Sequence, residues 1–231
     1  MQQIADGVRE MGFAVNDAAV ARMVQHAEGV LAANETMNLT TIPPEQFVGL
    51  HVLDSLSALP HLEAAAPGGV ADLGAGAGYP GIPLAIASGR PVDLVESVRK
   101  KAAFLSRVCA ELCLEATVHP IRAEELALVN GGAYSAVVAR ALSSLPSLAE
   151  LAAPILSAGG VLICLKGSPE ASELERGDAA AHLCGLKRQA TESVTVPWVD
   201  AQRTIVVYRK VGPARIPLPR RVGLAQRQPL A

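Results

Sequence analysis

The stretch Gly69–Ala87, G-V-A-D-L-G-A-G-A-G-Y-P-G-I-P-L-A-I-A, decides the fold of this 231-residue chain. It predicts a short buried strand over Val70–Leu73, a glycine-rich turn over Gly74–Gly81, and a helix directly after it. Glycine has no Cβ and adopts positive φ readily, so such a turn lets a ligand approach the backbone closely. The helix then begins with backbone N–H groups that lack a partner within the helix. The stretch is therefore typical of a cofactor-binding strand–turn–helix unit.

One acidic residue discriminates between the ligands that suit this turn. The spacing Gly76-x-Gly78-x-x-Gly81 matches the dinucleotide fingerprint. However, Asp72 ends the strand, and its charge would repel a pyrophosphate placed on the turn. A carboxylate there suits the amino group and sulfonium of S-adenosylmethionine (SAM). We therefore favour a methyl donor as the ligand, with an NAD-dependent oxidoreductase as an alternative.

The composition indicates one sizeable domain with a small extension. No apolar run reaches the roughly 18 residues that span a bilayer, and residues Met1–Met11 lack the apolar segment of a secretory signal. The four cysteines contain no C-x-x-C pair, which argues against a zinc site or a disulfide framework. These features predict a cytoplasmic protein with no metal site and no membrane span.

Charge is distributed unevenly along the chain. All 22 acidic residues lie at or before Asp200, whereas seven basic residues and no acidic residue occur from Arg203 onward. A basic arm on an acidic body is what a surface that contacts phosphates needs. The net charge of −2 argues against a uniformly basic nucleic-acid binder.

Hydrophobic periodicity divides the chain into three segments. One-faced patterns predict helices over residues 17–33 and 43–58, so residues 1–65 form a helical N-terminal extension. Residues 66–211 alternate strands with helices, which predicts a mostly parallel, doubly wound sheet, with an antiparallel final pair because no crossover helix separates those two strands. Residues 212–231 form the basic C-terminal arm. The seven expected strands are Val70–Leu73, Val92–Val95, Ala116–Ile121, Tyr134–Ala139, Val161–Leu165, Thr191–Val196 and Arg203–Tyr208.

Polar residues follow the expected strands. In open parallel sheets, ligands bind beyond the carboxyl ends of the strands, where the strand order reverses. Asp72, Glu96, Arg122–Glu124, Arg140 and Lys166 each stand at such an end, so one rim of the sheet should carry them all. Glu96 lies about 20 residues beyond the glycines, where a carboxylate accepts hydrogen bonds from ribose hydroxyls. Because SAM and NAD both contain ribose, Glu96 does not discriminate between them.

These motifs resemble the GidB/RsmG methyltransferases, which modify N7 of a guanosine in the small-subunit (16S) ribosomal RNA of bacteria. The resemblance covers almost the whole chain, and its most specific part is P-G-I-P-L-A-I after the glycine turn. It implies a Rossmann-like class I SAM-dependent methyltransferase fold. The matching motifs are N-L-T at Asn38–Thr40, H-x-L-D-S-L at His51–Leu56, the turn at Asp72–Ile86, E-S-x-x-K-K-x-x-F-L at Glu96–Leu105, R-A-E-E at Arg122–Glu125, R-A-L at Arg140–Leu142, K-G at Lys166–Gly167 and P-R-R-x-G at Pro219–Gly223.

Two sets of site residues follow. The turn itself offers Asp72, Gly76 and Gly78 to the donor, and the resemblance adds Gly74, Tyr79, Glu96, Ala123, Glu124 and Arg140. Arg140 suits either the carboxylate of SAM or the RNA. By resemblance, the RNA side consists of Asn38, His51, Asp54, Lys100, Lys166, Arg220 and Arg221.

The expected reaction needs no catalytic base. N7 of guanine carries a free lone pair on the major-groove edge, so the enzyme must position it in line with the sulfonium methyl and exclude water. The segment A-R-A-L after the fourth strand differs from the N-P-P-Y type that holds an exocyclic amine. We expect a monomer that acts on 16S rRNA, by resemblance in the 530-loop region, either naked or within the small ribosomal subunit. A small-molecule SAM-dependent methyltransferase and a non-catalytic RNA-binding module are further alternatives.

Overall fold

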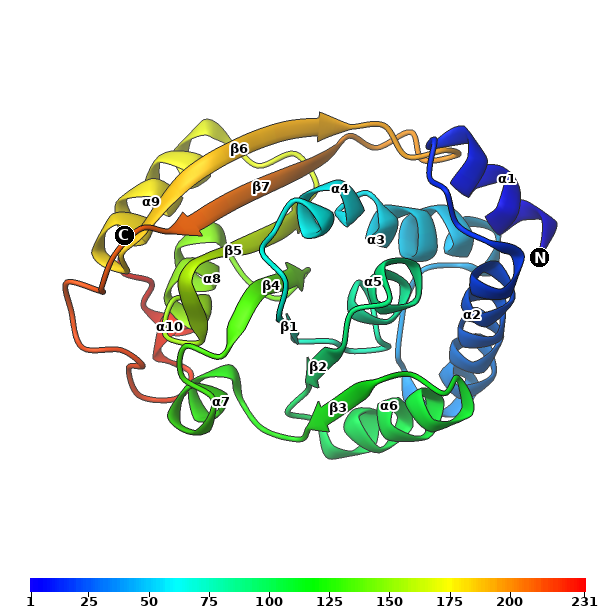
Figure 1. The fold of residues 1–231 in the computed structure, drawn as a ribbon, viewed down its shortest axis with the longest axis horizontal. Coiled ribbons are helices and arrows are strands. Elements are labelled where there is room, and N and C mark those ends of the chain that lie inside the picture. Colours follow the sequence, from blue (N-terminus) through cyan, green and yellow to red (C-terminus); the bar gives the residue numbers. More distant parts are fainter.

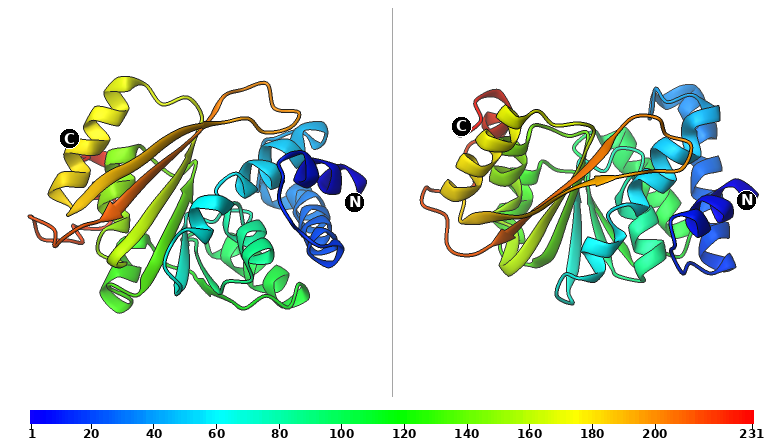
Figure 2. Two further views of the ribbon diagram at one scale, coloured as in Figure 1. Left: turned by 45° about the horizontal axis from the view of Figure 1, so that its top comes forward. Right: turned by 90° about the horizontal axis from the view of Figure 1, so that it is seen from above.

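The computed structural model describes residues 1–231 and contains a seven-stranded sheet with helices on both faces (Figures 1 and 2). The strand order is β3-β2-β1-β4-β5-β7-β6, so the order reverses between β1 and β4. The first five strands are parallel and the final pair, β6 and β7, is antiparallel, as predicted. The strand β7 is also antiparallel to its other neighbour, β5. The strands are β1 (Gly69–Leu73), β2 (Val92–Val95), β3 (Ala116–His119), β4 (Tyr134–Arg140), β5 (Leu156–Lys166), β6 (Leu186–Val194) and β7 (Arg203–Lys210).

Helices cover both faces of the sheet, so both faces are buried. Because successive residues of a strand point to opposite sides, neighbouring residues enter different cores. Val138 of β4 belongs to the core on the face of α5 and α6, whereas Val137 belongs to the core on the other face. This two-sided burial explains why the strands are nearly continuous apolar runs. The helices after β1 are α5 (Gly81–Ser88), α6 (Arg99–Glu111), α7 (Ala123–Val129), α8 (Leu145–Ala152), α9 (Ala171–Leu183) and α10 (Leu224–Arg227).

The N-terminal extension is helical, as predicted, but its second half is less regular than expected. Asn16 caps α2, since its side chain accepts a hydrogen bond of 2.8 Å from the N–H of Ala19. The single helix expected over residues 43–58 is instead a 3₁₀ turn, a π-helical segment and a short α-helix. The elements are α1 (Gln2–Glu10), α2 (Asp17–Met37), η1 (Pro44–Gln46), η2 (Val48–Leu53), α3 (Asp54–Leu56) and α4 (Leu59–Glu63). The helices α1 and α4 are short, and the sequence did not predict them.

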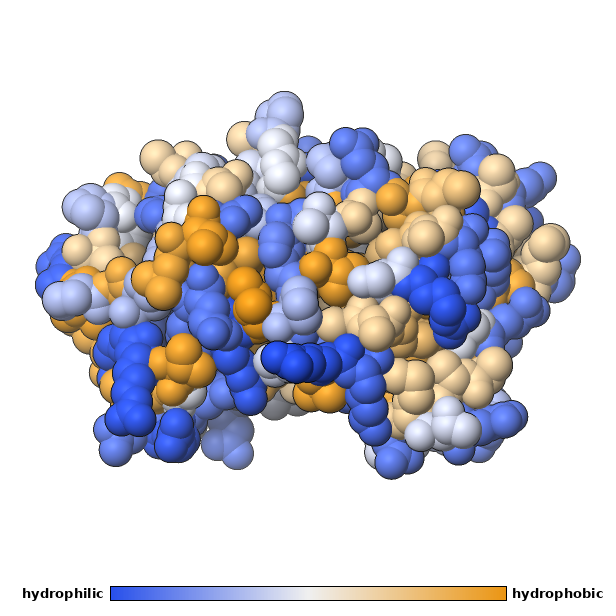
Figure 3. Space-filling model, turned by 90° about the horizontal axis from the view of Figure 1, so that it is seen from below, coloured by the Kyte–Doolittle hydropathy of each residue, from blue (hydrophilic) through white to orange (hydrophobic).

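The extension shares a hydrophobic core with one face of the sheet. A cluster of 39 buried residues joins Met23 and Phe47 of the extension to Ile82 and Leu84 of α5. The N-terminus lies at one end of the molecule and the C-terminal segment at the other (Figure 1). None of the helices has the combination of length and apolarity needed to cross a bilayer. On the face in Figure 3, hydrophobic residues form separate patches among hydrophilic ones.

Candidate functional site

The glycine turn after β1 adopts a backbone that its glycines permit. Gly74 and Gly76 have φ of 74° and 57°, in the left-handed region. A Cβ at Gly81 would lie 2.6 Å from Oδ2 of Asp72, so the turn also packs tightly against the end of β1. This packing leaves the backbone of Gly74 and Gly76 facing a cavity at the carboxyl ends of the strands.

That cavity, here called the glycine-turn pocket, has a volume of about 300 Å³. It lies where the strand order reverses between β1 and β4, as expected for an open parallel sheet. Of the nine predicted donor-binding residues, Gly74, Gly76, Glu96, Ala123 and Glu124 line it. Several other residues line the pocket without having been predicted from the sequence, among them Ser97, Lys101, Leu142 and Gln226.

Glu96 is a carboxylate of the glycine-turn pocket that two backbone N–H groups hold in place. Its side chain is buried, and Oε2 accepts a hydrogen bond of 3.1 Å from the N–H of Gly76. Its Oε1 accepts one of 2.7 Å from the N–H of Val98. The carboxylate is thus fixed between the turn and the start of α6, where its remaining lone pairs can accept from vicinal hydroxyls. With the glycine backbone beside it, this geometry fits the ribose of SAM.

Asp72 does not line the glycine-turn pocket. It is fully buried, and Oδ2 accepts a hydrogen bond of 2.8 Å from the N–H of Gly81. Burial raises the pKa of Asp72 to about 7, against a smaller opposing effect of that hydrogen bond. Oδ1 has no hydrogen-bond partner. Asp72 therefore holds the turn together, whereas the sequence predicted a direct contact with the donor.

A second cavity, here called the Arg140 pocket, adjoins the first through Ala141, which lines both. Its volume is about 480 Å³. Ala141 has φ of 52°, a left-handed conformation that is strained for a residue with a Cβ. The pocket brings together four of the seven predicted RNA contacts and Arg140, namely Asn38, His51, Asp54, Lys166 and Arg140, and it adds Thr40 and Arg203.

Asp54 joins two strands to the extension within the Arg140 pocket. Its Oδ2 lies 2.9 Å from Nη1 of Arg140, at the end of β4, and its Oδ1 lies 3.0 Å from Nε of Arg203, at the start of β7. Nη1 of Arg140 also donates to the carbonyl of Leu50, at 2.7 Å, in the π-helical segment. Asp54 of α3 thus pairs with both arginines, and Leu50 of η2 adds a hydrogen bond to Arg140. Arg140 therefore holds the extension against the sheet instead of facing the glycine-turn pocket.

His51 is held as a neutral ring. Nη2 of Arg140 donates to Nδ1 of His51 at 2.8 Å, so the proton must be on Nε2, which lies 2.7 Å from Oγ1 of Thr40. Burial, together with the charge of Arg140, lowers the pKa of His51 to about 3. Both ring nitrogens are therefore occupied, and His51 is not available as a general base.

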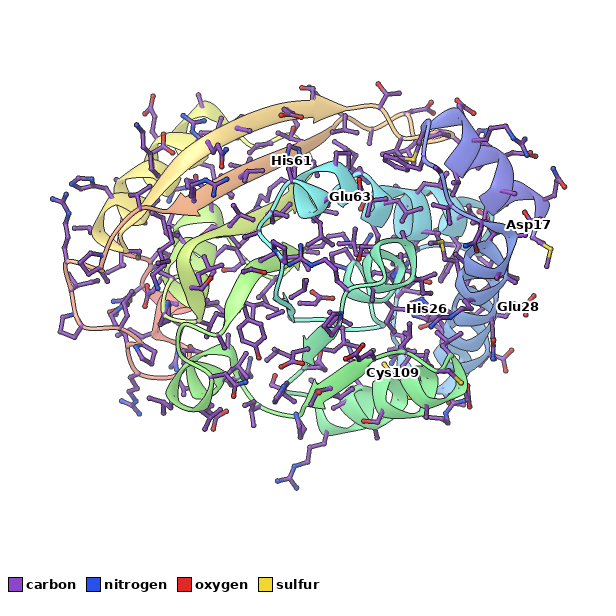
Figure 4. All side chains as sticks on the ribbon, in the orientation of Figure 1. Asp17, His26, Glu28, His61, Glu63 and Cys109 are labelled. Atoms are coloured by element: carbon purple, nitrogen blue, oxygen red, sulfur yellow. The ribbon has the colours of Figure 1, made fainter.

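Tyr79 is buried in an aromatic stack on the extension side. Its ring centre lies 4.5 Å from that of His26 and 4.6 Å from that of His51. The guanidinium of Arg140 lies 5.5 Å from the centre of the Tyr79 ring. Tyr79 and the adjacent Gly78 therefore face the extension, although the sequence predicted that both would contact the donor. Figure 4 shows His26 on the side of α2 that faces α5.

His26 should make the stability of the protein depend on pH. Its Nε2 donates to the carbonyl of Ala77 at 2.8 Å, and burial lowers its pKa to about 4. In the unfolded chain His26 has a pKa near 6.5, so between pH 6.5 and 4 it is protonated in the unfolded state and neutral in the native state. The free energy of unfolding therefore falls as the pH drops from 6.5 toward 4. We expect His26 to remove about 2 kcal/mol of stability between pH 7.5 and 5.

Urea denaturation of the wild type and of His26→Gln at both pH values measures this effect. The difference between their pH dependences isolates His26 from His51 and Asp72. Equal pH dependences of the two proteins would contradict the expectation.

The remaining predicted RNA contacts lie apart from the Arg140 pocket. Lys100 is exposed at the start of α6, while its neighbour Lys101 lines the glycine-turn pocket. Arg221 is exposed in the C-terminal arm. Arg220 turns inward and forms an ion pair with Glu150 of α8, which differs from the expectation that it faces a phosphate.

The solved structures that resemble this protein confirm the predicted fold. Geranyl diphosphate C-methyltransferase from Streptomyces coelicolor, solved with S-adenosyl-L-homocysteine, superposes with a TM-score of 0.55 over 68% of this chain and 76% of that chain. The sequence identity is 15%, so the likeness concerns the fold alone. It is the Rossmann-like class I methyltransferase fold.

Sequence comparisons identify the family. The model of the GidB family, described as rRNA small subunit methyltransferase G, matches residues 19–206. The ribosomal RNA small subunit methyltransferase G of Pelotomaculum thermopropionicum is 35% identical, over 99% of this chain and 98% of the relative. The protein of the same name from Roseiflexus sp. is 37% identical over 100% of both chains. The chain therefore belongs to the GidB family of small-subunit rRNA methyltransferases.

Proposed function

We propose that this SAM-dependent rRNA methyltransferase transfers the methyl group to N7 of a guanosine in 16S rRNA. The glycine-turn pocket holds SAM, with Glu96 at the ribose and the start of α7 at the adenine. SAM supplies the electrophilic methyl group. The Arg140 pocket holds the target nucleotide, and the two pockets meet at Ala141.

The observation that carries this proposal is that the Arg140 pocket has no free base. Asp54 is paired with two arginines, and both ring nitrogens of His51 are hydrogen-bonded. An acceptor that must lose a proton before attack would need a base here. The N7 lone pair of guanine needs none, so positioning and exclusion of water suffice. This favours N7 over an exocyclic amine or a ribose hydroxyl.

The charge of the Arg140 pocket suits an RNA backbone. Arg140, Lys166 and Arg203 line it, against the single carboxylate of Asp54. The chain contains only 3% aromatic residues, which disfavours recognition of single strands by base stacking. We infer that a monomer recognises a preformed RNA surface, by resemblance the 530-loop region, within the small ribosomal subunit. The extension (residues 1–65) and the core (66–211) each form part of this RNA-binding surface.

Transfer of labelled methyl groups tests the proposal. SAM is incubated with the protein and naked 16S rRNA, assembled small subunits, or no RNA, and nuclease fragments are analysed by mass spectrometry. We expect label on a guanine N7. Label on another atom, or SAM binding without transfer to either RNA substrate, would overturn the assignment and favour a small-molecule acceptor.

RNA affinity should depend on salt and on Lys166. Nζ of Lys166 lies 2.8 Å from Oε1 of Glu173, and Lys166 lines the Arg140 pocket, where a phosphate of the RNA can replace Glu173 as its partner. Each phosphate contact adds about 0.7–0.9 to the slope of log affinity against log salt, because counterions are released. Lys166→Gln should therefore lower the slope by roughly one such unit. Filter binding across a salt series measures it, with the exposed Lys187→Gln as the control.

A further inference from the structure

The C-terminal arm (residues 212–231) forms part of the wall of the glycine-turn pocket. We propose that docking of this arm sets the affinity of the protein for SAM. The inference rests on the SAM-binding role proposed above, and it is independent of which RNA base is methylated. It reassigns a basic segment whose composition alone suggests contact with phosphates.

The first anchor of the arm is the ion pair between Arg220, which is partly exposed, and the buried carboxylate of Glu150. Nε and Nη2 of Arg220 bond the two carboxylate oxygens of Glu150 at 2.6 and 2.5 Å. Glu150 lies on α8 and is 3% exposed, so the carboxylate depends on Arg220 for its charge partner. Nη2 of Arg220 also donates to the carbonyl of Gln228, at 2.8 Å, which folds the end of the arm back on itself. The guanidinium of Arg220 is therefore bonded to groups of the protein itself.

The second anchor lies one turn of α8 before Glu150. Oγ of Ser147, also on α8, donates to the carbonyl of Ala225 at 2.8 Å. Both residues are buried, and α10 packs against α8 (Figure 1). Two independent contacts thus hold the arm in a defined position on the core.

From this position the arm reaches the glycine-turn pocket at two points. The N–H of Gly223 donates to Oε1 of Glu124 at 2.7 Å, and Gln226 lines the pocket itself. Glu124 lies in the first turn of α7, where adenine is expected, and its second oxygen is left for a ligand. The arm therefore orients one pocket carboxylate and supplies one pocket side chain. Undocking would remove both effects.

The location of the arm separates it from the Arg140 pocket. No arm residue lines that pocket, whereas residues of the extension do. The arm lies at the opposite end of the molecule from α1 and α2 in Figures 1 and 2. An effect of the arm on SAM is therefore expected without any RNA present.

Calorimetric binding of S-adenosylhomocysteine to the full chain, without RNA, tests the proposal. Arg220→Gln leaves Glu150 buried and unpaired, and should weaken binding about tenfold or more. Arg220→Gln combined with Glu150→Gln removes both charges and should restore binding to within about threefold. Arg215→Gln removes a charge from the same arm but breaks no ion pair, and should leave the dissociation constant unchanged.

Gln226→Ala provides a variant that cannot fail simply by unfolding, because Gln226 is exposed. It should weaken binding about three- to tenfold. The proposal would be overturned if Gln226→Ala and folded Arg220→Gln both bound S-adenosylhomocysteine with wild-type affinity. If Arg220→Gln then also bound rRNA more weakly, the arm would be an RNA-binding element. Tight binding of S-adenosylhomocysteine by a protein that methylates no guanine N7 would contradict the proposed function and leave the proposal about the arm intact.

Discussion

Asp54→Ala is expected to lower the free energy of unfolding by about 3–5 kcal/mol. The Asp54 side chain is 7% exposed and pairs with both Arg140 and Arg203. Its removal leaves the two half-buried guanidinium groups of the Arg140 pocket without a counter-charge. Because these two ion pairs of Asp54 also join the extension to the ends of β4 and β7, methyl transfer to rRNA should fall together with stability.

Chemical denaturation of Asp54→Ala and the wild type measures this loss. Asp178→Ala is the matched control, because its ion pair with Arg188 has side chains 39% and 33% exposed and should contribute at most about 1 kcal/mol. A midpoint of Asp54→Ala that equals that of the wild type would show that water and neighbouring carbonyls satisfy the two arginines equally well.

Glu96→Ala is expected to weaken SAM binding about 100-fold while the protein remains folded. The carboxylate is aligned by Gly76 and Val98, so its bonds to the ribose hydroxyls form without further ordering. Hydrogen bonds to a charged group contribute about 1.5–3 kcal/mol each. Isothermal titration of SAM measures the effect.

Two variants complete this experiment. Glu96→Gln keeps the shape but loses the charge, and should bind SAM with intermediate affinity. Glu111→Ala removes an exposed carboxylate at the end of α6 that pairs only with Arg107, and should bind SAM normally. Binding by Glu96→Ala within a few-fold of the wild type would mean that the ribose lies elsewhere.

The sequence predicts the fold and much of the site for definite physical reasons. Buried parallel strands are apolar runs separated by helical periods, so their number and directions can be read directly. The rule that ligands bind beyond the carboxyl ends of strands brought Glu96, Gly76 and Ala123 to one pocket. Arg203 was missed, although the same rule contains the signal: the first residue of an antiparallel strand lies at the same rim as the last residue of its parallel neighbours.

Other features depend on contacts that local pattern cannot reveal. Whether Arg220 faces solvent is decided by Glu150, 70 residues away. Lys100 and Lys101 differ by a rotation of about 100° around α6, and that rotation decides which of them faces the glycine-turn pocket. Asp72 and Tyr79 flank the glycines of the turn in the sequence. The packing of the extension nevertheless turns Tyr79 away from the pocket, and the tight closure of the turn buries Asp72.

The shared hydrophobic core limits how the substrate range of this protein can be altered. Met23, Phe47 and Leu53 of the extension are buried with α5, which also begins at the glycine turn. An extension transplanted onto another methyltransferase core would meet an apolar surface of different shape, and the recipient α5 would be left partly uncovered. Engineers who seek new RNA targets should therefore vary the polar residues around Thr40 and Lys166 within this chain, and leave its helices in place.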